Sequence, residues 1–207
     1  MSAETSRARY WPVLFARAVP ALVVGLVITF SADHSSKFGL IVFGAFAVSS
    51  GAIMGWDALQ FGKRTVSLFQ AIVTMVAGVA ALVFNGAGAG TLFLIVISFA
   101  ASTGFLELYR GLRARGSNPI ARDWISVGVL TSALAIAVLL VPADYAAPWS
   151  VVDKGITVSG TLTSQIIVVG IVGAYAILLG VYLVIAGFSA RWAARDEAVT
   201  TTAVTGQ

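Results

Sequence analysis

The segment Ile166–Phe188, IIVVGIVGAYAILLGVYLVIAGF, is apolar throughout and contains no charged residue. A transmembrane α-helix needs about 20 consecutive, predominantly apolar residues to cross the hydrocarbon core of a bilayer. Over the whole chain 58% of the residues are hydrophobic and 11% are charged, whereas an ordinary soluble domain carries about 25% charged residues. We therefore expect an all-α integral membrane protein.

Further apolar segments of similar length are separated by short polar or glycine-rich breaks, and each is expected to span the membrane. In chain order the six expected spans are Trp11–Phe30, Phe38–Trp56, Val66–Asn85, Thr91–Tyr109, Trp124–Val141 and Ile166–Phe188. We expect a polar arm at 1–10, a membrane domain at 11–191 and a polar tail at 192–207. The tail has too few apolar residues to fold alone, so we expect it to be disordered.

The break at 143–163 is the longest between two spans, and loops of this length usually have a function or are disordered. It is mostly small and apolar, with Pro148 and Trp149 among scattered polar residues. We expect irregular chain that caps the bundle or meets a partner. The alternative is a lid of partly buried irregular chain without such a role.

Basic residues are concentrated on one side of the expected membrane domain. Six spans place both termini on the same side, and the ends and loops on that side carry Arg7, Arg9, Arg17, Lys63, Arg64, Arg110, Arg113, Arg115, Arg122, Arg191 and Arg195. The opposite side has only Lys37 and Lys154. Since positively charged loops stay in the cytoplasm, we expect both termini on the cytoplasmic side of the plasma membrane.

An aromatic residue followed by a small-x-x-x-small motif recurs along the chain. The copies are Phe46-Ala47-x-x-x-Gly51, Phe99-Ala100-x-x-x-Gly104 and Tyr175-Ala176-x-x-x-Gly180. Gly25 and Gly78 are separated by the same 53 positions as Phe46 and Phe99, and Tyr175 follows after a further 76. We expect three repeated helical hairpins, at 11–58, 66–113 and 122–191. Chance is the alternative, because alanine and glycine are abundant here.

Within each motif the alanine and the glycine lie four residues apart, so they share one face of the helix. Small residues on a shared face let two backbones approach closely in lipid, where no hydrophobic force drives helices together. The expected helix-packing residues are Gly25, Ala47, Gly51, Gly55, Gly78, Ala100, Gly104, Gly173, Ala176, Gly180 and Gly187.

These features resemble the HdeD family of membrane proteins, six-helix proteins built on a short two-helix repeat. The resemblance rests on the two early glycines, on the three aromatic motifs and on the segment Glu107–Arg113, ELYRGLR, and it covers about residues 11–191. It implies a six-helix membrane fold and a role in acid resistance, with no established molecular activity. The break at 143–163 and the fifth span, which lacks the glycine, depart from the compact repeat.

Arg17 and Glu107 are the two ionisable residues placed within expected spans. Charges inside a membrane are costly and are therefore treated as functional candidates. One interpretation is a direct intramembrane ion pair that ties the first hairpin to the second and lines a polar path. The other is that both side chains extend to the lipid headgroups, with Glu107 paired to Arg110 one helical turn on.

The chain lacks the residue combinations typical of catalytic and metal sites. It has no cysteine and a single histidine, His34, which lies beside Asp33 in an expected external loop and is a weak candidate for acid sensing. The string Gly86–Gly90 lacks the lysine of a phosphate-binding loop. We therefore expect no catalytic, cofactor-binding or metal-binding residues, and no enzymatic activity.

Three functions fit these observations. The first is a non-enzymatic, HdeD-type membrane protein in acid or envelope stress resistance. The second is an accessory subunit of a larger membrane complex, which would meet its partner through the glycines of the sixth span and the break at 143–163. The third is a small transporter or channel, which needs polar residues along its path, such as Ser49, Ser50, Thr74, Ser102 and Thr103. Membrane lipids are the expected partners, with a larger membrane complex or self-association as the alternatives. Nucleic acid is not expected, because the basic residues behind the net charge of +4 lie in short segments between apolar runs, where lipid headgroups explain them.

Overall fold

The computed structural model of the chain describes residues 3–60, 65–118, 120–153 and 156–205. Its helices, in chain order, are α1 (Ala3–Phe30), α2 (Ser36–Gln60), α3 (Thr65–Val83), α4 (Ala89–Arg113), α5 (Ala121–Leu139) and α6 (Ser164–Thr205). Each contains a segment long and apolar enough to cross a membrane, which confirms the prediction of six long apolar helices.

The outer surface of the bundle is apolar along most of its length. Large side chains such as Val76, Leu94, Ile136 and Ile185 are more than half exposed on four different helices. Contiguous apolar surface of this extent is rare on a soluble monomer and is what a lipid environment requires. The fold is therefore that of a chain suited to cross a membrane several times.

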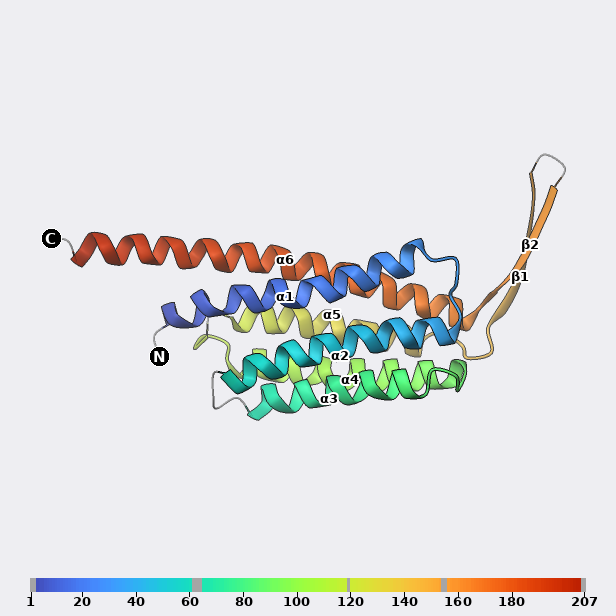
Figure 1. The fold of residues 1–207 in the computed structure, drawn as a ribbon, viewed down its shortest axis with the longest axis horizontal. Helices are drawn as coiled ribbons and strands as arrows, with labels where there is room; N and C mark the ends of the chain where they lie inside the picture. Colours follow the sequence, from blue (N-terminus) through green and yellow to red (C-terminus); the bar gives the residue numbers. More distant parts are fainter. Residues whose placement is uncertain (1–2, 61–64, 119, 154–155, 206–207) are drawn as a thin grey trace.

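The helices run side by side along the long axis, with both termini at one end (Figure 1). Helices that follow each other in the sequence are in contact, and α1 also contacts α6, so the bundle closes on itself. The most extensive contacts join α1 to α6, α2 to α3 and α4 to α5. These pairs link neighbouring expected hairpins, whereas the two helices within each expected hairpin contact each other less.

The even-numbered helices meet at the centre of the bundle, where α2, α4 and α6 contact one another. The ring of Phe46 lies 6.4 Å from that of Phe99 and 6.4 Å from that of Tyr175, both edge-on. Phe43 adds a fourth ring, 5.2 Å from Phe99. The aromatic residue of each small-x-x-x-small motif therefore lies in the core.

The C-terminal tail differs from the prediction, and the N-terminal arm, for which no secondary structure was predicted, is helical. The expected N-terminal arm is helical from Ala3, and the tail expected to be disordered continues α6 as far as Thr205. The segment 189–205 contains neither glycine nor proline and is rich in alanine, so nothing in it ends the helix. The part of α6 beyond the bundle is visible as the long extension toward the C-terminus (Figure 1).

The break at 143–163 is not irregular chain, as predicted, but largely an antiparallel hairpin of β1 (Ala146–Asp153) and β2 (Ile156–Thr163). Trp149 pairs with Gly160 and Val151 with Val158. Valine and threonine favour extended backbone, which explains the strands. The hairpin is attached at the bundle end opposite the termini and projects away from the bundle, so it does not cover that end as a lid (Figure 1).

Candidate functional site

A small polar cavity inside the bundle is the candidate functional site. All six helices contribute to its lining, and the polar members are Arg17, Ser50, Gln70, Thr74, Thr103, Glu107, Thr131 and Tyr175. Its volume is about 20 Å³, and a cavity needs about 10–15 Å³ to hold one water molecule. The cavity therefore has room for one water and for no larger solute.

Arg17 of α1 and Glu107 of α4 form a direct ion pair at this cavity. Arg17 Nη2 lies 3.3 Å from Glu107 Oε1, and their side chains are 14% and 4% exposed. Of the two interpretations left open by the sequence, the structure shows the direct pair. A buried carboxylate needs a charged partner. Glu107 has this partner on α1, so the pair joins helices of the first and second expected hairpins.

A second polar bridge lies beside the ion pair, between α3 and α4. Arg110 Nη1 donates a hydrogen bond of 2.8 Å to Gln70 Oε1, and Gln70 is 1% exposed. The Arg110 guanidinium also lies over the ring of Trp124, 4.3 Å from its centroid. Gln70 is the counterpart of Arg17 at the 53-residue shift, so the repeat pattern could have identified it as a core polar residue.

Three of the cavity hydroxyls bond back to their own helices. Thr74 donates to the carbonyl of Gln70 at 2.9 Å, and Thr103 to that of Phe99 at 2.7 Å. Thr131 donates to its own helix in the same way and also lies 3.1 Å from the Tyr175 hydroxyl, which links α5 to α6.

Thr131 and Tyr175 were not predicted as site residues. The available signal was the tyrosine that replaces phenylalanine in the third motif. Of the five hydroxyl residues considered for a polar path, three line the cavity, whereas Ser49 and Ser102 bond to their own helices outside it. The Ser50 hydroxyl is buried with no hydrogen-bond partner among the described residues.

The expected packing glycines of α6 lie against α1. A Cβ atom built at these positions would come within 3.1 Å of α1 side chains: Gly173 meets Ile28, Gly180 meets Leu22, and Gly187 meets Phe15. Gly25 of α1 faces Ile177 of α6 in the same way, at 2.6 Å. The sequence left open whether these α6 glycines meet the chain's own bundle or a partner, and the structure shows them packed against α1.

The other expected packing residues lie mainly at the α2–α3 and α4–α5 contacts. A Cβ atom at Gly78 would lie 2.6 Å from the backbone nitrogen of Val48 and 2.9 Å from Ala47 Cβ. Gly51 faces the backbone of Ala71 and Met75, and Gly104 faces Ser132. Ala100 and Ala176 are buried in the core, and Gly55 is less constrained, 3.8 Å from Ala71.

Two further close contacts join α4 to α5. A Cβ atom at Gly111 would lie 2.6 Å from Ile125, and one at Gly128 would lie 2.7 Å from the Leu108 backbone nitrogen. The sequence did not indicate these glycines, because neither belongs to the repeated motif.

The loop before α2 carries a carboxylate with a perturbed pKa. The Ser35 backbone N–H donates to Asp33 Oδ1 at 2.8 Å, and this bond, the Ser35 hydroxyl and neighbouring His34 lower the pKa of Asp33. A lowered folded-state pKa stabilises the loop above about pH 4, and the contribution is lost as the pH falls through the folded-state pKa. Whether His34 senses acid stays a hypothesis.

The chemistry available to the cavity is that of one carboxylate, one guanidinium and several hydroxyls. Such a set can hold a water molecule and fix the helices around it. Comparison of the chain with protein-family models, with curated proteins and with solved structures finds no match.

Proposed function

We propose that the protein is a non-enzymatic, multi-pass plasma-membrane protein of HdeD type that acts in acid or envelope stress resistance. The observation that carries this proposal is the buried Arg17–Glu107 pair, 3.3 Å between Nη2 and Oε1, at a cavity lined by all six helices. An ionisable pair inside a membrane bundle is expensive and is a functional candidate by default. A change that breaks this pair would leave one charge buried without its partner, which would destabilise the bundle.

The groups around Glu107 come from every neighbouring helix. Arg17 on α1, Gln70 on α3, Thr131 on α5 and Tyr175 on α6 line the same cavity. Arg110, one turn further along α4, is bonded to Gln70. Arg17 contacts Glu107 directly, 3.3 Å from Nη2 to Oε1, so its loss should impair the acid response.

We also propose that the bundle consists of three copies of a two-helix unit. Equivalent residues at the 53-residue shift line the same cavity, namely Arg17 with Gln70 and Ser50 with Thr103. The pairs α2–α3, α4–α5 and α6–α1 would then be equivalent contacts between successive units.

The proposed orientation places both termini in the cytoplasm. Six crossings, an even number, put the termini on one side, and the basic residues at that end favour the cytoplasmic side. Of the basic residues behind that orientation, Lys63 and Arg64 lie outside the described residues, as does Lys154 on the opposite side.

Deletion of the gene followed by acid challenge tests the stress role. We expect lower survival of the deletion strain, rescue by the wild-type chain and poor rescue by Glu107→Ala. Gly170→Ala is the matched control, because a Cβ atom there would meet nothing within 4 Å. Equal survival of the deletion and parent strains under acid and other envelope stress would contradict the proposed role.

Single cysteines in the cysteine-free chain test the orientation. A membrane-impermeant thiol reagent on intact cells should label Val151→Cys in the hairpin and should not label Arg113→Cys, because the two lie at opposite ends of the bundle. External labelling at position 113 would reverse the proposed topology.

An accessory subunit is the second candidate function, and the hairpin is the observation that favours it. Ala147, Trp149, Val151, Val158 and Leu162 lie on one face by pairing and alternation, and the last four are between 37% and 56% exposed. An isolated two-stranded hairpin is at best marginally stable in water, so a partner protein packed against this face would stabilise the hairpin. Mass analysis after mild-detergent purification should show a stoichiometric partner that is lost when Trp149 and Val151 become serine.

A transporter or channel has less support. The cavity of about 20 Å³ is too small for any solute larger than water, and the Arg17–Glu107 ion pair lines it. Proton flux into liposomes above that of protein-free liposomes, abolished by Glu107→Gln, would favour this function over the other two.

A further inference from the structure

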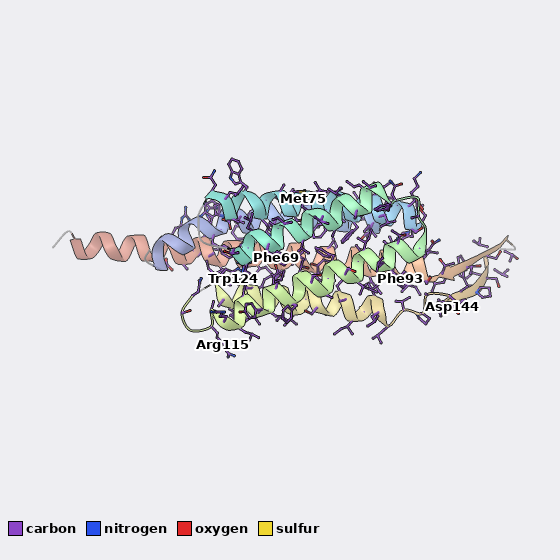
Figure 2. All side chains as sticks on the ribbon, turned by 90° about the horizontal axis from the view of Figure 1, so that it is seen from below. Phe69, Met75, Phe93, Arg115, Trp124 and Asp144 are labelled. Atoms are coloured by element: carbon purple, nitrogen blue, oxygen red, sulfur yellow. The ribbon has the colours of Figure 1, made fainter. Side chains whose placement is uncertain are left out.

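A groove on the outside of the bundle, at the end where the termini lie, shares no lining residue with the Arg17–Glu107 cavity. It opens between α3, α4 and α5, has a volume of about 480 Å³, and is lined by residues that include Arg110, Arg113, Tyr109 and Trp124. The described lining contains two guanidinium groups and no carboxylate. Figure 2 shows Phe69 and Trp124 near this end, with Arg115 just beyond α4.

The basic part of the groove is held in place by aromatic side chains. Arg113 Nη1 donates a hydrogen bond of 2.7 Å to the Tyr109 hydroxyl. Trp124 supports the Arg110 guanidinium from below at 4.3 Å. A guanidinium presents several N–H donors in a planar fork that fits phosphate oxygens, so two adjacent ones suit a phosphate group.

The groove continues along α3 and α4 as an apolar channel, and the basic and apolar parts together are called the α3–α4 groove. This neighbouring pocket of about 330 Å³ is lined by Phe69 of α3 with Phe105 and Leu106 of α4, and it shares Tyr109 with the basic groove. Phe69 and Phe105 are 55% and 66% exposed. Phe105 also stacks on Tyr109, with 6.3 Å between ring centroids, so the apolar and basic parts form one continuous surface.

The separation of the two parts matches a phospholipid. Phe105 precedes Arg113 by eight positions, which is about 12 Å along a helix at ~1.5 Å per residue. The headgroup layer of a bilayer is about 5–7 Å thick on each side, so a phosphate at Arg113 places Phe105 at the level of the acyl chains. Basic pockets between spanning helices at the cytoplasmic side are suited to anionic lipid headgroups.

We propose that the α3–α4 groove binds one anionic phospholipid, with its phosphate on Arg110 and Arg113 and an acyl chain over Phe69 and Phe105. The charge of the groove selects an anionic headgroup over a zwitterionic one, and the apolar channel selects a lipid over free phosphate. The inference rests on the proposed membrane location, and it is independent of the stress role.

Native mass spectrometry of the full chain in mild detergent tests the site, with phosphatidylglycerol, phosphatidylcholine or inorganic phosphate added separately. We expect retained phosphatidylglycerol and little retained phosphatidylcholine. Arg113→Gln should lower phosphatidylglycerol retention about fivefold, the loss expected for one basic contact. Arg115→Gln is the matched control, because it removes a neighbouring positive charge that does not line the groove, and it should retain the lipid.

The apolar half has its own pair of variants. Phe69→Ala should weaken lipid retention, whereas Phe84→Ala should not, because Phe84 follows the far end of α3 and is equally exposed, at 56% against 55%. Three results would overturn the proposal. They are an equal loss of lipid retention in Arg113→Gln and Arg115→Gln, equal retention of phosphatidylcholine and phosphatidylglycerol, and displacement of the lipid by millimolar phosphate. A chain that fractionates away from membranes would instead contradict the proposed location, so the two failures are distinguishable.

Discussion

The α1–α6 contact and the polar centre of the bundle hold helices together by different physical means. At the α1–α6 contact, glycines on both helices bring the backbones close, and a Cβ atom at Gly25 would lie 2.6 Å from Ile177. At the centre, helices are joined by an ion pair and hydrogen bonds, as between Arg17 and Glu107. The α1–α6 contact depends on shape, so a single added methyl group should disturb it. The polar centre depends on paired charge, so removal of one charged side chain should disturb it.

The largest expected effect is at the centre. Glu107→Ala leaves the Arg17 guanidinium buried without its carboxylate, and breaking a buried pair in this way costs about 3–5 kcal/mol. The measurement is the free energy of unfolding in mixed detergent micelles. Arg17→Ala should lower it as well, and the double variant should be less destabilised than the sum of the two. Strict additivity would mean that the two groups do not interact.

The next effect is at a glycine contact. Gly78→Ala places a methyl group 2.6 Å from the Val48 backbone nitrogen, which cannot move aside as a flexible side chain can. Overpacking of this kind costs about 1–3 kcal/mol, measured in the same unfolding assay. Gly170→Ala serves as the control, because it adds the same methyl group in open space on α6. If both variants unfold alike, close packing does not explain these glycines.

A smaller effect is expected for the hydrogen bond between α5 and α6. Tyr175→Phe removes the hydroxyl that lies 3.1 Å from Thr131 Oγ1 while keeping the ring contacts with Phe46. Interhelical hydrogen bonds in membrane proteins average about 0.6 kcal/mol. The unfolding free energy should fall by about that amount, and Thr131→Val should have a similar effect. A loss as large as that of Glu107→Ala would place the tyrosine hydroxyl among the essential polar contacts.

The smallest effect is expected at Gly55, which the sequence grouped with the packing glycines. A Cβ atom there would lie 3.8 Å from Ala71, an ordinary van der Waals distance. Gly55→Ala should therefore be neutral or stabilising by up to about 1 kcal/mol, since alanine favours the helix more than glycine does. A destabilisation comparable to that of Gly78→Ala would show that α2 and α3 are closer in the membrane than in this structure.

The sequence predicted the number and location of the long apolar helices well, because length and hydropathy are local properties. It also selected Gly78 and Gly104, whose surroundings are tight, through the 53-residue repeat. It could not place Gly111 and Gly128, because a glycine outside a repeat carries no signal of what lies across from it. The hairpin was missed because its alternation of apolar and hydroxyl residues was read as a long loop between apolar spans.

The amino-acid sequence by itself determined that the chain forms six long apolar helices, because the length and the hydropathy of a segment depend on that segment alone. The tertiary structure alone decided which surfaces meet. It placed the α6 glycines against α1, joined Arg17 to Glu107 across 90 positions of sequence, and left the α3–α4 groove open. The reason is that contacts between helices depend on how the helices are rotated and paired, and no single segment encodes its partner.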